Sequence, residues 1–241
     1  MRKFAIFDLD DTLVDSTGAI DRWFVELAQR RGLGPDGLEF LRAEQTRPVP
    51  PEESFRAIVD HFGFPESADE LREVFAEGMP LLVRVFDGVL ENLRSLREQG
   101  WRTALLTNGT EIQQRPKLRD GLHDLFDVLC FADDEAVRKP APEIFRLVAH
   151  RAGSRLDGGW MIGDSLEYDV AGAAAVGMST IWVSGGAATA TGGPVPDATV
   201  RCVAEAFPVM LRGRAAGRTE RGGHPPGPVR APAVTTAPAD T

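Results

Sequence analysis

Three aspartates lie within four residues near the start of the chain, directly after a short apolar run. Asp8, Asp10 and Asp11 follow Phe4–Phe7, whose unbroken apolar character predicts a buried strand. Carboxylates at the carboxyl end of such a strand lie where open α/β sheets bind ligands. Two of them about 6 Å apart repel by about 3 kcal/mol at an effective dielectric of ~20. A bound cation or a reaction would offset this cost, and a plain acidic turn is the simpler alternative.

Polar residues also follow three later apolar runs of the chain. Because the carboxyl ends of parallel strands meet at one edge of a sheet, we expect these groups to lie close to the first aspartates. Carboxylates, a hydroxyl, an amide and a lysine together supply what phosphoryl transfer needs, which is positioning and neutralisation of charge. The residues are Thr107 and Asn108, Lys139, and Asp164 with Asp169.

Strand patterns alternate with helix patterns over most of the chain, which predicts an α/β fold with a Rossmann-like parallel sheet and helical crossovers. After the first strand, the predicted strands are Arg102–Thr107, Phe126–Phe131, Trp160–Ile162 and Thr180–Val183. The predicted helices among them are Val89–Gln99, Glu111–Asp120, Pro142–Arg151 and Glu167–Val176.

Residues 16–86 interrupt this alternation with amphipathic segments only. The segments Ile20–Arg31, Leu38–Ala43, Glu52–Phe62 and Ser67–Glu77 predict a small helical bundle. The chain is therefore expected to have a core domain made of residues 1–15 and 87–211, with a helical domain of residues 16–86 inserted into it. Residues 212–241 are rich in Gly, Pro, Ala and Arg, so a disordered tail is expected there.

The composition limits the classes of partner. The 241 residues are 43% hydrophobic and 26% charged, with a formal net charge of −9. This acidic balance argues against a nucleic-acid backbone or a membrane surface as the main partner. A small anionic substrate would need local positive charge from a lysine and a divalent metal. Two cysteines give no disulfide framework, and the first apolar run is too short for a signal peptide. We therefore expect a cytoplasmic protein, either a monomer or a homodimer.

The order of the motifs resembles the haloacid dehalogenase (HAD) superfamily, whose largest branch is phosphatases. The resemblance rests on Asp8-Leu-Asp10-Asp-Thr12, Thr107-Asn108-Gly109, Lys139 and Gly163-Asp164-Ser165 followed by Asp169, and it covers residues 3 to about 185. It implies a Rossmann-like core, with residues 16–86 as a cap that closes over the site and contributes to substrate choice.

The resemblance also implies a role for each candidate residue. Asp8 would be the nucleophile that forms an aspartyl phosphate, and Asp10 would be the general acid and then the general base. Mg²⁺ would be held by the Asp8 carboxylate, the Asp10 backbone carbonyl and Asp164. The phosphoryl group would be bound by Thr107, by Asn108 through its amide, and by Lys139, while Asp169 would orient Lys139 or support the metal ligands.

The favoured function is a Mg²⁺-dependent phosphatase acting on a small metabolite, such as a sugar phosphate, a phosphoglycolate-like compound or a nucleotide monophosphate. A phosphomutase would share these motifs but would release little phosphate. A haloacid dehalogenase is disfavoured because that chemistry, in the family, lacks the aspartate found here as Asp10. A non-catalytic binding module would be expected to have lost one of the motif residues. The stretch Gln114–Leu118 also resembles phosphatases of small metabolites and nucleotides, although Gln114 and Lys117 could equally form a solvated helix face.

Overall fold

The computed structural model describes residues 3–133, 136–188 and 192–213. The predicted tail lies outside the described residues from position 214 onward. Within the described ranges, six parallel strands form one sheet in the order β3-β2-β1-β4-β5-β6. The strands are β1 (Phe4–Phe7), β2 (Arg102–Leu106), β3 (Val128–Cys130), β4 (Trp160–Gly163), β5 (Ser179–Val183) and β6 (Ala198–Val200). The predicted α/β fold with a parallel, Rossmann-like sheet is confirmed.

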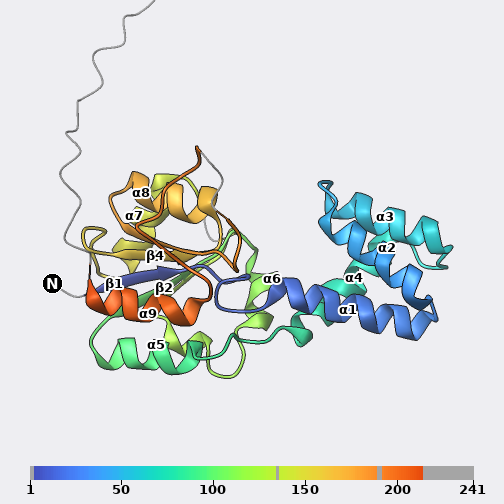
Figure 1. Cartoon of the computed structure of the whole chain (residues 1–241), viewed down its shortest axis with the longest axis horizontal. Helices are drawn as coiled ribbons and strands as arrows, with labels where there is room; N and C mark the ends of the chain where they lie inside the picture. The colour runs from blue at the N-terminus through green and yellow to red at the C-terminus, as the bar shows by residue number, and fades with distance from the viewer. Residues whose placement is uncertain (1–2, 134–135, 189–191, 214–241) are drawn as a thin grey trace, which may run out of the picture.

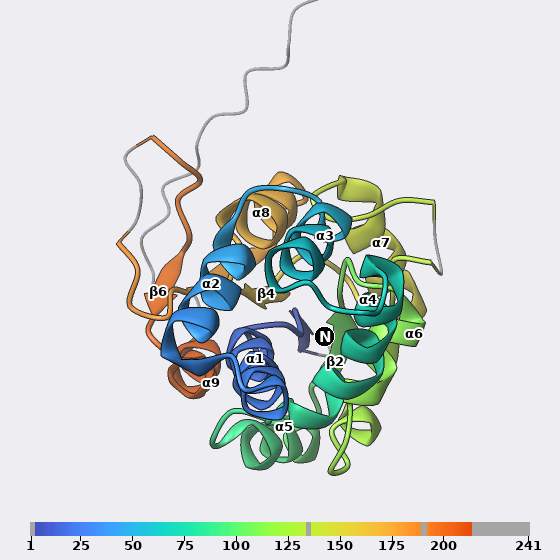
Figure 2. The same ribbon diagram turned by 90° about the vertical axis from the view of Figure 1, so that its right-hand side faces the viewer.

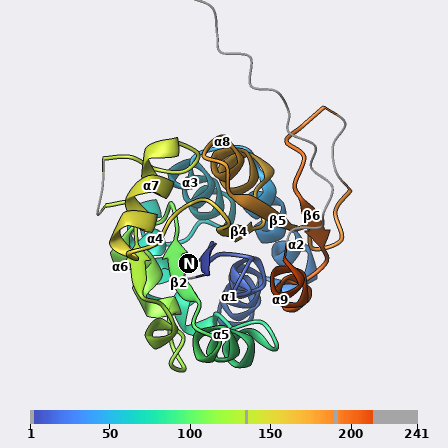
Figure 3. The same cartoon turned by 90° about the vertical axis from the view of Figure 1, so that its left-hand side faces the viewer.

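Helices cover both faces of the sheet, as Figures 1 and 3 show. One face carries α5 (Val89–Glu98) and α9 (Val203–Arg212), and the other carries α7 (Pro142–Arg151) and α8 (Gly172–Ala175). Successive side chains of β1 point to opposite faces. Accordingly, Ala5 and Phe7 join the apolar cluster of α5 and α9, whereas Phe4 and Ile6 join that of α7. Burial on both faces explains why the strand is continuously apolar.

Several element boundaries differ from the sequence-based expectation. The helix expected over Glu111–Asp120 is a single turn, α6 (Glu111–Gln114), followed by a 3₁₀ turn over Arg115–Lys117. Pro116 lacks the backbone N–H that a continuing α-helix requires. The helix expected over Glu167–Val176 begins as a π-helical turn, Leu166–Ala171, before α8. Strand β6 and helix α9 were not predicted.

Helices α1 (Ser16–Arg31), α2 (Gly34–Thr46), α3 (Pro51–Phe62) and α4 (Ala68–Gly78) form a helical unit beyond the sheet. Its own apolar cluster includes Trp23, Leu41, Ile58 and Leu71, all at most 1% exposed. In Figures 1 and 2 the unit lies beyond the carboxyl end of β1. In the part of the chain that the structure describes, no helix combines the length and apolar character that a membrane crossing requires.

Two adjacent chain segments join the helical unit to the sheet. The backbone N–H of Asp15 donates to the carbonyl of Arg84 at 2.9 Å, and that of Phe86 donates to Leu13 at 3.0 Å. An antiparallel bridge joins Val14 and Val85 between these bonds. The entry and exit of the unit are therefore tied to each other next to the end of β1.

The topology places a crevice beside β1. The chain continues from β1 to β2 and β3 on one side, then returns to β4 on the other side. Loops that leave neighbouring strands in opposite directions open a crevice at their carboxyl ends. The pairing continues past the strand end, because the N–H of Asp8 donates to the carbonyl of Ile162 at 2.9 Å. The residues after β1 and β4 are thus brought together.

Leu93→Ala tests the core between α5 and the sheet. Leu93 is fully buried, so truncation should lower the free energy of unfolding by about 2–5 kcal/mol. Leu81→Ala is the matched control, because this side chain is 62% exposed and should change stability by less than ~0.5 kcal/mol. Urea denaturation measures both, and equal losses would contradict the assignment of the core.

Candidate active site

A cavity of about 340 Å³ opens at the carboxyl edge of the sheet. Most of its lining residues are polar or charged, and its wall comes from the loops after four different strands. The lining includes every residue that the sequence predicted for the site: Asp8, Asp10, Thr107, Asn108, Lys139, Asp164 and Asp169. The structure therefore brings all of these residues together, from positions as far apart as 161 residues in the chain.

Asp8 lies at the centre of this group. It follows the last residue of β1, and only 7% of its surface is exposed. Its Oδ1 accepts a hydrogen bond from the Lys139 ammonium at 2.5 Å. Among the described residues, none donates a hydrogen bond to its Oδ2. One carboxylate oxygen of Asp8 is therefore held by a buried cation, and the residue lines the cavity.

Lys139 is buried between two carboxylates. Its Nζ also donates to Oδ1 of Asp169 at 2.6 Å, and the residue is 5% exposed. Asn108 fixes the backbone at this point, because its side-chain amide donates to the carbonyl of Lys139 and accepts from its N–H, both at 2.9 Å. The Asn108 side chain thus positions the lysine, which leaves its backbone amide as the group that could meet a phosphoryl oxygen.

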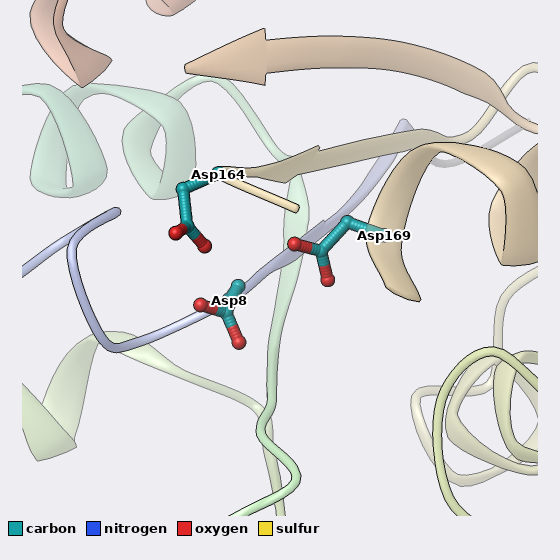
Figure 4. Close-up of side chains that lie close together, drawn as sticks. All are labelled: Asp8, Asp164 and Asp169. Atoms are coloured by element: carbon teal, nitrogen blue, oxygen red, sulfur yellow. The ribbon is translucent and has the colours of Figure 1, made fainter. Parts of the chain in front are cut away.

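Asp164 and Asp169 approach Asp8 from the loop and helix after β4, as Figure 4 shows. Each of the three offers a carboxylate oxygen, and these oxygens lie within 4.8 Å of one another. Asp169 already uses both oxygens, because Oδ2 accepts from the N–H of Ser165 at 3.0 Å. Gly163 makes this approach possible, since a Cβ there would lie 2.1 Å from Asp169 Oδ2.

The pKa values of the cluster reflect an excess of negative charge. Burial raises the pKa of Asp8 to about 8, with Lys139 opposing and Asp169 adding to the rise. Loss of hydration, together with the charges of Asp169 and Asp11, raises the pKa of Asp164 to about 6. Burial alone would lower the pKa of Lys139, but its two carboxylate partners outweigh that effect and raise it. The lysine is therefore charged, whereas Asp8 and Asp164 resist ionisation.

These residues fit a divalent cation. Three carboxylates lie close together and one ammonium contacts two of them, so two negative charges are uncompensated when all three are ionised. Positive charge at this point would favour the ionised carboxylates. Carboxylate oxygens are also the ligands that Mg²⁺ prefers. Asp8 and Asp164 have oxygens available for such an ion, whereas those of Asp169 are engaged by Lys139 and Ser165.

Asp10 lines the same cavity but contacts a different cation. Its Oδ1 accepts from Lys117 Nζ at 2.6 Å and from the hydroxyl of Ser16, and its Oδ2 accepts from Gln114 Nε2 at 2.6 Å. Burial alone would raise the pKa of Asp10, but Lys117 and these hydrogen bonds hold it below its usual range. Gln114 and Lys117 are 4% and 7% exposed, so the alternative of a solvated helix face is wrong. The spacing of three residues puts Gln114 and Lys117 on the same side of a helical turn. It is the feature of the sequence that could have predicted that both are buried.

Asp11 has a local structural role. Its φ of +53° lies in the left-handed region, which aspartate adopts more readily than most residues. Its two carboxylate oxygens accept from the backbone N–H and the hydroxyl of Thr17, at 2.8 and 2.6 Å. The third acidic residue of the motif thereby ties the turn after β1 to the start of α1.

Comparison with known proteins shows which protein family has a sequence similar to this chain. The sequence model of the family described as haloacid dehalogenase-like hydrolase matches residues 3–177. A glyceraldehyde 3-phosphate phosphatase of Methanothermobacter thermautotrophicus is 30% identical over 206 residues, covering 76% of this chain and 86% of its own. A phosphoglycolate phosphatase of Pseudomonas putida is 31% identical over 196 residues, covering 76% and 70%.

A solved structure of the same superfamily has a similar fold. The HAD phosphatase from Thermococcus onnurineus superposes with a TM-score of 0.60 at 26% sequence identity, covering 89% of this chain and all of its own. The family model's match, residues 3–177, contains the four loops that line the cavity.

Lys139→Met tests the electrostatics of the metal-free cluster. Removal of one partner of a buried ion pair costs about 3–5 kcal/mol, so unfolding free energy should fall by this order at pH 8. The loss should be smaller at pH 5, where the raised pKa of Asp8 keeps that carboxyl protonated. Lys3→Met is the control, because this exposed lysine only approaches the Trp101 ring and should cost less than ~1 kcal/mol. A loss that is independent of pH would contradict this account.

Proposed function

The chain belongs to the haloacid dehalogenase-like hydrolases and is a phosphoric monoester hydrolase of that superfamily; we propose that it hydrolyses small phosphorylated metabolites with Mg²⁺, through an aspartyl phosphate on Asp8. The observation that carries the proposal is the convergence of Asp8, Lys139 and Asp164 on one cavity.

In the first step, a carboxylate oxygen of Asp8 attacks phosphorus, and the bond between phosphorus and the leaving oxygen breaks. Asp10 in its protonated form donates a proton to that oxygen, so the product leaves as an alcohol and Asp10 becomes the carboxylate that Lys117 and Ser16 favour. Lys139 and the hydroxyl of Thr107 bind the phosphoryl oxygens, where negative charge is concentrated. The position of all four residues on the cavity wall supports this division of roles.

In the second step, Asp10 accepts a proton from water, and the water oxygen attacks phosphorus. The bond from phosphorus to Asp8 breaks, which releases inorganic phosphate and restores the carboxylate. Lys139 then stabilises the regenerated Asp8 through their existing ion pair. Asn108 and Asp169 keep the ammonium in place throughout, by the hydrogen bonds to its backbone and its Nζ.

Asp8, Asp164 and the backbone carbonyl of Asp10 would hold the magnesium ion. When bound, it would neutralise the charge that develops on the phosphoryl group and favour the ionised form of Asp8. The uncompensated negative charge of the cluster and the raised pKa values of Asp8 and Asp164 support this assignment.

We propose that the substrate is small and that the helical unit, residues 16–86, acts as the cap that limits its size. The cavity of about 340 Å³ is near the lower end of typical ligand sites. The relatives named above are phosphatases of glyceraldehyde 3-phosphate and phosphoglycolate, which are both small phosphate monoesters. Ser16, the first residue of the unit, contacts Asp10, so the unit meets the site directly.

Asp8→Asn tests the nucleophile. Phosphate release from a panel that includes glyceraldehyde 3-phosphate and phosphoglycolate should fall by at least ~10⁴-fold, because the amide cannot form the acyl phosphate. The melting temperature should not fall in the metal-free protein, since the substitution removes a carboxylate whose ionisation is unfavourable. Asp157→Asn makes the same change at an exposed residue and should leave activity unchanged. Retained turnover in Asp8→Asn would remove the nucleophile assignment.

Thermal unfolding with and without MgCl₂ tests the metal site. Folding favours the protonated forms of Asp8 and Asp164, so their contribution to metal-free stability is present at low pH and is lost as pH rises through about 6 and about 8. Mg²⁺ binds the ionised forms. At 100 times its dissociation constant it should raise the melting temperature by roughly 5–10 °C at pH 8, and by much less at pH 5.

Asp164→Asn is the control for the metal experiment and should lose most of the gain at pH 8. A gain of the same size at both pH values, or one that survives in Asp164→Asn, would argue against the proposed ligands. EDTA should also abolish phosphate release, and added Mg²⁺ should restore it.

A further inference from the structure

The Asp10 side chain lies in the loop after β1, so its position depends on hydrogen bonds from other parts of the chain. It lies beyond the last residue of β1, and its side chain remains 33% exposed at the cavity. A group that must donate a proton to one oxygen atom has to be held within hydrogen-bond reach of it. Among the described residues, the donors that hold the Asp10 carboxylate come from two places, which are Ser16 on α1 and the segment 114–117.

The segment 114–117 presents two buried donors to Asp10, one for each carboxylate oxygen. Lys117 Nζ lies 2.6 Å from Oδ1, and Gln114 Nε2 lies 2.6 Å from Oδ2. The neighbouring Arg115 is exposed, is not among the residues that line the cavity, and pairs with Glu111 on the surface. The two buried side chains are therefore the ones that this turn directs at the site.

Gln114 also links Asp10 to the phosphate-binding loop. The same Nε2 donates to the hydroxyl oxygen of Thr107 at 3.1 Å. Gly109 leaves the space for this contact, since a Cβ there would lie 2.0 Å from Gln114 Nε2. The amide thus spans the proton-transfer group and the hydroxyl that would bind a phosphoryl oxygen.

We propose that Lys117 and Gln114 are positioning residues for Asp10, which hold its carboxylate where the leaving oxygen of the substrate must receive a proton. This inference rests on the proposed function, because it takes Asp10 as the general acid. Neither residue needs to contact the substrate. Their contribution should therefore depend on how much the leaving group requires a proton.

Lys117→Met and Gln114→Met test the proposal with two substrates. For the alkyl phosphate that the wild-type protein hydrolyses best, each variant should lower kcat/KM by about 10- to 100-fold, which is part of the 10²–10⁴-fold value of a general acid. For 4-nitrophenyl phosphate the loss should be less than ~3-fold, because 4-nitrophenolate is a weak base and departs without a proton. Arg115→Met, on the same turn but exposed, should change neither value.

A double-mutant cycle separates positioning from a general structural effect. Asp10→Asn should remove the alkyl-phosphate activity that depends on the acid, and adding Lys117→Met to it should cause little further loss. Lys117→Arg should restore part of the activity, because it retains the charge and the donor. The Gln114 variant supplies the same comparison if Lys117→Met does not fold.

The outcomes distinguish this inference from the proposed function. If the wild-type protein releases no phosphate from any probe, the proposed function fails. If the wild type is active but the Lys117 and Gln114 variants lose both substrates equally, lose neither, or add fully to Asp10→Asn, the positioning role is overturned.

Discussion

The structure of the site depends on the attraction between one buried ammonium and the carboxylates around it. Lys139 contacts Asp8 and Asp169 at 2.5 and 2.6 Å, yet Asp164 adds a further negative charge that the lysine does not neutralise. Burial raises the pKa of Asp8, and the charges of Asp169 and Asp164 add to the rise. A cluster with this excess of negative charge is poorly suited to stabilise the fold, but it is well suited to bind a cation and a phosphoryl group. The cost in stability and the capacity for chemistry have the same origin.

The fold produces this concentration of charge through its topology. Strands β1 and β4 are neighbours, although about 150 residues separate them, and the connection reverses direction beside β1. Asp8 and Asp164 follow these two strands and therefore face each other. Lys139 reaches them from the loop after β3, and Asn108 holds that loop by two hydrogen bonds. On the other side of the cavity, Ser16 connects Asp10 to the helical unit, so the same turn that carries the acidic motif also carries the link between the two parts of the chain.

Much of this arrangement could be predicted from the sequence, because each motif residue follows a buried strand and parallel strands end at one edge. Asp8 and Asp164 needed only that rule, whereas Lys139 lies nine residues after the end of β3 and was identified by the resemblance of its motif to the family. The network around Asp10 could not be derived in the same way. Its partners lie on a turn that Pro116 shortens, and the burial of Gln114 and Lys117 depends on a loop more than 100 residues away.

Strand β6 and helix α9 could not be predicted from the sequence, for other reasons. Strand β6 has three residues, too few to show a period, and α9 contains Pro208, which normally predicts a helix break.

The most direct test of the central claim is a crystal structure of the protein grown with Mg²⁺ and beryllium fluoride, which mimics a phosphoryl group bound to a carboxylate. The account predicts beryllium bonded to an Asp8 oxygen, a fluoride within hydrogen-bond distance of Lys139 Nζ, and the metal ion in contact with both Asp8 and Asp164. Beryllium fluoride bound to another residue, or a metal ion that leaves Asp164 without contact, would contradict it.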